Sequence, residues 1–257
     1  MKKLLAFILL LPMTTFAASP FDGTWIGNVE SMKFSDKPDV LVLDKGMYSC
    51  STCVPPYEVK ADGADHAVTG HVYYNSVAVR VASPNSVQVT RKLAGKVAST
   101  SSFTISADGK SMNEKLTDRT GKEEATMEFA NMRVAPAPAG AHALSGSWRT
   151  EKLQNASANG ITVTYKSAPG GLAMSSPTGQ SYEAKFDGKD SAVAGDPGKT
   201  MVSLKSVDAH TIIETDKRLG KVTDVVRMSV SADGRTMQVV DEDKLAGATS
   251  SWTMDKK

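Results

Sequence analysis

Two stretches of the chain decide its fold: Phe103-Thr-Ile-Ser-Ala-Asp-Gly-Lys-Ser-Met112 and Met228-Ser-Val-Ser-Ala-Asp-Gly-Arg-Thr-Met237, which lie 125 residues apart. In each, apolar and polar residues alternate before an Asp-Gly pair. Alternation with a period of two is typical of a strand with one buried face, and Asp-Gly tolerates the positive φ values of a tight hairpin. The pattern therefore predicts antiparallel strands joined by hairpins.

The chain contains an internal repeat. At the same offset of 125 residues, Tyr57–Gly63 matches Tyr182–Gly188, and Lys92–Val97 matches Lys217–Val222. A constant, gap-free offset over this length indicates one duplicated domain, because the repeats of a solenoid are shorter and more numerous.

A linker separates the two copies. The segment Ala135–Ala141 alternates Ala with Pro and has no apolar period, which suits an extended connection. The predicted organisation is a first β-barrel domain at 19–134, an Ala/Pro linker at 135–142 and a second β-barrel domain at 143–257.

The predicted fold class is all-β. Alternation recurs in both copies, for example at Val77, Val79 and Val81, and no stretch after the N-terminal region has a convincing helical period. The spacing of runs and turns suggests about eight strands per copy. Eight antiparallel strands can close on themselves and leave no exposed edge, which favours an up-and-down barrel in each copy. A β-sandwich is the alternative, because strand number alone does not distinguish the two.

The N-terminus has the pattern of a signal peptide at residues 1–17. Lys2 and Lys3 precede the apolar run Leu4–Leu11, and small residues follow, with cleavage expected after Ala17 or Ala18. The apolar run is shorter than the roughly 20 residues that a transmembrane helix needs. We therefore expect a periplasmic or secreted protein with no membrane span after cleavage.

The charge of the mature chain is balanced. Without Lys2 and Lys3 the sequence has 28 basic and 28 acidic residues, scattered along its length. Nucleic acid is therefore not an expected partner, since its binding needs a clustered positive surface. The chain has no Gly-x-Ser-x-Gly nucleophile motif. We predict a protein that is not an enzyme and carries no cofactor, and the sequence leaves its protein partners unknown.

The two cysteines of the chain, Cys50 and Cys53, are predicted to form a disulfide, because an oxidising compartment joins neighbouring thiols. A metal site made of Cys50, Cys53, His66 and His71 is a weaker alternative, since the spacing falls within the zinc-site range. A zinc finger is excluded, because the intervening Pro-Pro and Asp-Gly pairs cannot supply its helix.

The second copy lacks all four of these residues. The equivalent positions are Ser175, Thr178, Ser191 and Asp196. The fold therefore does not need the four residues. A thiol-redox role is a further alternative, although the cysteine pair is not at the helix N-terminus that activates such thiols. The acidic run Asp241-Glu-Asp243 is interpreted as a solvated face or loop.

A short motif opens each copy: Gly23-Thr-Trp25 and Gly146-Ser-Trp148. These look like the Gly-x-Trp signature of lipocalin-type barrels. The wider pattern, with an opening Asp-Gly-Thr-Trp and a later Ser-x-Asp-Gly hairpin, resembles a group of uncharacterised exported bacterial lipocalin-like proteins.

The resemblance implies a role for the tryptophans. In lipocalins this residue closes one end of the barrel, often beneath a basic residue from the last strand. Arg133 is the candidate partner of Trp25 in the first copy, and Lys256 that of Trp148 in the second. The alternative is that both tryptophans are ordinary core residues.

The resemblance also implies a function. It predicts an exported, non-enzymatic protein that binds a small apolar or amphipathic molecule in one or both lipocalin-like barrels. The alternative is an envelope structural or interaction module with no ligand cavity. A third hypothesis is a metal or thiol-redox role of the first domain.

Overall fold

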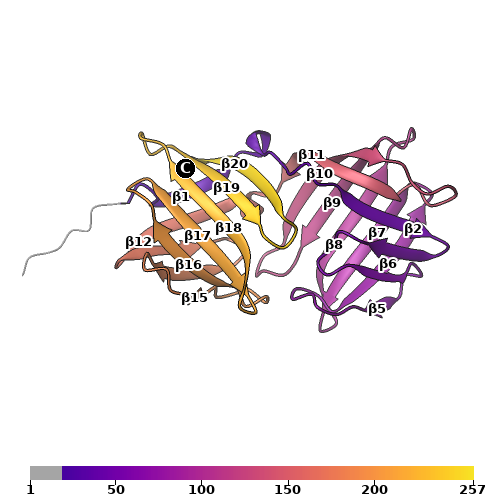
Figure 1. Cartoon of the computed structure of the whole chain (residues 1–257), viewed down its shortest axis with the longest axis horizontal. Coiled ribbons are helices and arrows are strands. Elements are labelled where there is room, and N and C mark those ends of the chain that lie inside the picture. The colour runs from indigo at the N-terminus through magenta and orange to yellow at the C-terminus, as the bar shows by residue number, and fades with distance from the viewer. Residues whose placement is uncertain (1–18) are drawn as a thin grey trace, which may run out of the picture.

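The computed structural model describes residues 19–257, which form two antiparallel ten-stranded sheets, each curled into a nearly closed barrel (Figure 1). The all-β prediction and the preference for barrels are confirmed. The predicted signal peptide at 1–17 and its cleavage sites at Ala17 and Ala18 lie outside the described residues. Within the described part of the chain, no helix is long and apolar enough to cross a membrane.

The first barrel has the strand order β4-β3-β2-β11-β10-β9-β8-β7-β6-β5. Its strands, in chain order, are β2 (Asp39–Asp44), β3 (Met47–Cys50), β4 (Tyr57–Lys60), β5 (Asp65–Ala67), β6 (Ser76–Ser83), β7 (Ser86–Leu93), β8 (Lys96–Ile105), β9 (Ser111–Asp118), β10 (Ala125–Ala135) and β11 (Gly146–Ala156).

The second barrel has the order β14-β13-β12-β1-β20-β19-β18-β17-β16-β15. Its strands are β1 (Gly23–Gly27), β12 (Thr162–Ala168), β13 (Gly171–Ser175), β14 (Ser181–Lys185), β15 (Ser191–Ala192), β16 (Met201–Ser206), β17 (Thr211–Arg218), β18 (Lys221–Val230), β19 (Thr236–Asp243) and β20 (Ala248–Lys256). The ten strands exceed the predicted eight, because strands as short as β5 and β15 carry no readable alternation.

The two copies exchange their first strands. Strand β1 lies between β12 and β20 of the second barrel, and β11 lies between β2 and β10 of the first. Short 3-10 helices, η1 (Val29–Ser31) and η2 (Ala158–Gly160), follow the exchanged strands as the chain crosses between barrels. The sheets therefore divide the chain differently from the predicted domains 19–134 and 143–257. Both opening strands carry the same Gly-x-Trp pattern, so each fits the other's barrel.

The exchange also changes the partners of the tryptophans. The Arg133 guanidinium lies 4.1 Å from the ring centroid of Trp148, and the Lys256 ammonium lies 4.8 Å from that of Trp25. The pairing expected within each copy, Arg133 with Trp25, is wrong because the tryptophans sit on the exchanged strands. Both rings are fully buried, and each indole N–H donates to a backbone carbonyl four residues earlier.

The backbone conformation and the space around it explain why the opening motif begins with glycine. Gly146 has φ of 134°, and Gly23 has φ of 133°, which L side chains rarely adopt. A side chain at Gly146 would also collide with the Arg133 guanidinium. The motif therefore combines a backbone bend, a buried ring and room for the basic residue that covers it.

The open ends of the barrels face each other. The tryptophans, covered by Arg133 and Lys256, lie at the outer ends, since Arg133 also contacts Gly109 in the turn between β8 and β9. The C-terminus lies at the outer end of the second barrel (Figure 1). At the inner ends, the backbone N–H of Lys122 donates to the carbonyl of Thr178 at 2.6 Å. Arg218 from the second barrel lies over the ring of Tyr73 from the first at 5.2 Å. We call these inner ends the mouths.

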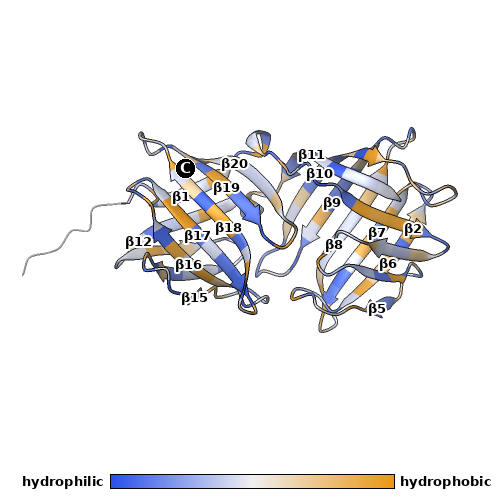
Figure 2. Ribbon diagram, viewed as in Figure 1, coloured by the Kyte–Doolittle hydropathy of each residue, from blue (hydrophilic) through white to orange (hydrophobic). Residues whose placement is uncertain are grey.

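The alternation that predicted the strands also places apolar side chains inside the barrels. Figure 2 shows hydrophobic and hydrophilic residues following one another along the strands of both sheets. Inward positions toward the outer ends hold buried apolar residues, such as Val87 and Met112 in the first barrel and Ile212 and Met237 in the second. Burying each such side chain stabilises the fold by about 1.5–3 kcal/mol.

The exchange can be tested by cross-linking. Thr24 and Thr164 are directly opposite on β1 and β12, with their hydroxyl oxygens 2.9 Å apart. We expect the Thr24→Cys/Thr164→Cys variant to form a disulfide, because opposed strand positions match disulfide geometry. Without exchange, Thr24 would occupy the place of Ser147, which is opposite Val40. Peptide mapping that found the disulfide in Thr24→Cys/Val40→Cys, and none in the first variant, would contradict the exchange.

The closure by Arg133 predicts an asymmetric stability effect. Its guanidinium donates to the carbonyls of Gly109, Ala143 and Ser145, whereas Lys256 donates only to that of Pro20. We expect Arg133→Met to lower the free energy of unfolding by about 2–3 kcal/mol, since three charge-assisted hydrogen bonds are lost. Lys256→Met should cost about 1 kcal/mol. Urea unfolding of both variants measures the difference, and equal losses would argue against this role of Arg133.

Candidate functional site

The mouth half of the first barrel contains a polar pocket of about 430 Å³. It begins where the apolar core ends, because the inward positions of β7 and β9 change from valine and methionine to Arg91 and Glu114. Its lining consists of Tyr73, Tyr74, Arg91, Ala98, Ser99, Ser101, Glu114, Leu116, Asp118, Thr120 and Gln180. Gln180 comes from the second barrel, so the facing mouths share this pocket.

Arg91 is the only cation that lines this pocket. Its Nη1 donates to Ser101 Oγ at 3.0 Å, and its guanidinium carbon lies 5.8 Å from the ring centroid of Tyr74. Among residues 19–257, no carboxylate lies within 4.0 Å of it. Burial raises the pKa of the nearby Glu114, and a hydrogen bond from Ser101 and the charge of Arg91 oppose this shift.

An aromatic cluster lies beside Arg91. The His71 ring stacks on Tyr74 at 4.3 Å and meets the edge of Tyr57 at 5.5 Å, while Tyr48 lies 6.1 Å from Tyr57. Tyr57 Oη and His71 Nε2 are buried and have no hydrogen-bond partner among the described residues. Burial lowers the pKa of His71, so the neutral ring is favoured.

The cysteines and histidines singled out from the sequence do not form one site. Cys50 and Cys53 are joined in a disulfide. His66 lies on β5, 2.8 Å from Asp62, while His71 belongs to the aromatic cluster. In the described range 19–257, no group of three or more His, Cys, Asp or Glu side chains is placed to hold a metal ion.

The second barrel has an acidic lumen. Glu214 and Asp216 face inward from β17, and Asp224 and Asp241 occupy inward positions of β18 and β19. Burial raises the pKa of Glu214 to about 8, that of Asp216 to about 7 and that of Asp241 to about 6, and neighbouring carboxylates add to each shift. The Tyr182 hydroxyl donates to Glu214.

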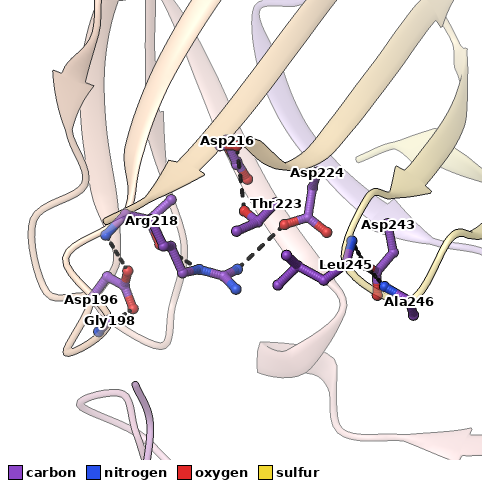
Figure 3. A network of polar contacts seen from close by, with 10 residues as sticks. Asp196, Gly198, Asp216, Arg218, Thr223, Asp224, Asp243, Leu245 and Ala246 are labelled. Carbon is purple, nitrogen blue, oxygen red and sulfur yellow. Dashed lines mark hydrogen bonds and ion pairs between the residues drawn. The ribbon is translucent and has the colours of Figure 1, made fainter. Parts of the chain in front are cut away.

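Figure 3 shows the polar contacts at this mouth. Arg218 lies 3.4 Å from the Asp224 carboxylate and donates to Thr200 Oγ1 at 3.1 Å. Asp241 Oδ1 is buried and has no hydrogen-bond partner in the described part of the chain. The interpretation of Asp241-Glu-Asp243 as a solvated face is therefore wrong for Asp241, which alternation turns toward the lumen.

An apolar pocket of about 280 Å³ lies where the second lumen meets the crossing segments. Four methionines line it, two from the second barrel, one from the first and one from the segment after η1: Met228, Met254, Met127 and Met32. The aromatic rings of Tyr165 and Trp252 complete its wall, and the Tyr165 hydroxyl contacts Met228 Sδ at 3.3 Å.

The charged lumen residues were not predicted from the sequence: Arg91, Glu114, Glu214 and Asp216. Their signal was present, because each continues an inward-facing series, as in Val87, Val89, Arg91. Charges in such a series are easily assigned to the solvated face, since charged groups are rarely buried. No protein-family model matches the chain, and no curated protein or solved structure matches it.

The acidic lumen predicts a pH dependence of stability. The pKa of Glu214 is raised in the folded state, so its contribution is fully present below about pH 4 and is lost as the pH rises through about 8. We expect the free energy of unfolding to fall between pH 5 and pH 8, and Glu214→Gln to remove on the order of 2 kcal/mol of that fall. Urea unfolding at both pH values tests this.

Glu183→Gln is the matched control for this measurement, because Glu183 is exposed on β14 of the same barrel. It should leave the pH dependence unchanged. A Glu214→Gln variant with the wild-type fall would contradict the placement of Glu214 in the lumen.

Proposed function

We propose that the protein is a non-enzymatic binding protein that holds a small amphipathic molecule in the lumen of one or both barrels, and that it works in the periplasm or outside the cell. The main support is the polar pocket of about 430 Å³ in the first mouth, above a packed core. Ligand pockets of proteins usually measure about 300–1,000 Å³. The disulfide between Cys50 and Cys53 supports an oxidising compartment.

The apolar pocket supports the same proposal for the second barrel. Its volume of about 280 Å³ is slightly smaller, but its lining is adaptable. Methionine side chains are flexible and polarisable, so they can adjust to apolar ligands of different shape. Trp252 is half-buried and offers a large apolar surface.

The geometry also suggests how a ligand enters. The outer ends are closed by Trp25 and Trp148, so access to both lumens lies at the seam between the facing mouths. The chain passes from one barrel to the other at the segments around η1 and η2. A small opening of the two barrels at this seam would admit a ligand.

Filling each lumen separately tests the proposal. We expect Ser99→Phe to abolish binding in the first pocket and Val163→Trp in the second, because both residues line their pockets and are partly exposed to them. Binding of the neutral dye N-phenyl-1-naphthylamine, followed by fluorescence, should weaken about tenfold or more when its pocket is filled. Val134→Phe, on the exposed side of β10, is the control.

The alternative function predicts a different result. If the wild-type protein and all three variants are folded and none binds the dye or a copurified molecule, the ligand proposal fails. That result would favour an interaction module that acts through its outer surface.

A further inference from the structure

We propose that the first barrel selects molecules that carry a carboxylate, and that Arg91 binds this group inside the lumen. This inference rests on the proposed function and adds the chemical class of the ligand. It depends on three observations: a half-buried guanidinium that lines the pocket with no carboxylate within 4.0 Å, a buried tyrosine hydroxyl in the neighbouring aromatic cluster, and opposite charge at the equivalent place in the other barrel.

The guanidinium of Arg91 has unused donor capacity. Arginine has five N–H donors, and the structure gives Arg91 one hydrogen bond, to Ser101 Oγ. Arg91 is half-buried at the pocket wall, and guanidinium favours planar, two-oxygen partners such as carboxylates. An anionic ligand would supply the partner that residues 19–257 do not place within 4.0 Å.

Tyr57 belongs to the aromatic cluster beside the pocket and is not part of the pocket lining. Its Oη is buried and has no partner among residues 19–257, and its ring lies 6.3 Å from that of Tyr74. Tyr74 in turn lies under the Arg91 guanidinium. The Tyr57 hydroxyl therefore adds a polar group next to Arg91 and Tyr74, with Tyr48 as its neighbour on the other side.

The two acidic residues of the pocket do not occupy this position. Burial favours the neutral form of Glu114, because it raises the pKa of that carboxyl, and Ser101 lies between Glu114 and Arg91. Asp118 lies at the rim and already accepts two hydrogen bonds of 2.7 Å from the backbone and hydroxyl of Thr120.

The second copy supplies an internal comparison. At the offset of 125 residues, Arg91 corresponds to Asp216, Ser99 to Asp224 and Leu116 to Asp241. Equivalent positions of the two barrels therefore hold a cation in the first lumen and carboxylates in the second. An anionic ligand would be repelled from the second lumen, so the two barrels discriminate between ligands by charge.

The uncharged part of the ligand would lie toward the mouth. Tyr73, Tyr74 and Leu116 line that side of the pocket and provide aromatic and aliphatic surface. The ligand class is therefore a compact carboxylate with an apolar or aromatic body, of a size that fits about 430 Å³.

A series that varies only the head group tests this inference. Decanoate, decanol and decylammonium would be titrated calorimetrically into the full mature protein at pH 7. We expect decanoate to bind at least about tenfold more tightly than decanol at one site, because the charged head group gains charge-assisted hydrogen bonds. Arg91→Gln should reduce the affinity for decanoate to that for decanol, whereas Arg91→Lys should retain part of the advantage.

Two controls make the outcomes distinct. Glu114→Gln should not weaken decanoate binding, because Glu114 does not occupy the position beside Arg91, and Asp216→Asn in the other lumen should leave the decanoate site unchanged. Equal affinities for decanoate and decanol in the wild type, or a preference for decylammonium at the Arg91 site, would overturn the inference while the proposed function stands. No binding of any of the three molecules would overturn both. The wild-type comparison does not depend on the folding of any variant.

Discussion

The exchange of opening strands is the constraint on which the rest of the structure depends. Strand β1 completes the second barrel and β11 completes the first, so neither sheet is whole without a strand from the other copy. Each exchanged strand carries a buried tryptophan. Its indole N–H donates to the backbone carbonyl four residues earlier, and a basic residue of the receiving barrel covers its ring. The same two strands therefore close the outer ends of the barrels and connect the barrels to each other.

This connection explains the position of the mouths. Because β1 and β11 start at the outer ends and run inward, the chain leaves each barrel at its inner end and crosses directly to the other. The crossing segments hold the two open ends together, and both pockets described above include residues from both barrels. A duplicated domain has thus become a molecule with two lumens that meet at a shared seam.

Within this shared frame, the two lumens have opposite chemical character. The apolar positions toward the outer ends match in both copies, as in Val87 with Ile212 and Met112 with Met237. Toward the mouths, Arg91 in the first copy corresponds to Asp216 in the second. Core positions tolerate little change in volume or polarity, because packing is dense and buried charge is costly. The partly solvated mouth permits charges, and this is where the copies differ.

Much of this could be predicted from the sequence. The period-two alternation, the Asp-Gly turns and the constant repeat offset indicated two antiparallel barrels, because these patterns depend on neighbours along the chain. Only the tertiary structure decided which barrel receives each Gly-x-Trp strand, since the motif fits both barrels equally in local conformation. It also decided that Arg91 and Glu214 face a lumen, because burial depends on strands that are distant in sequence. The alternation assigns each residue to a face of the sheet, and closure of the barrel determines what that face surrounds.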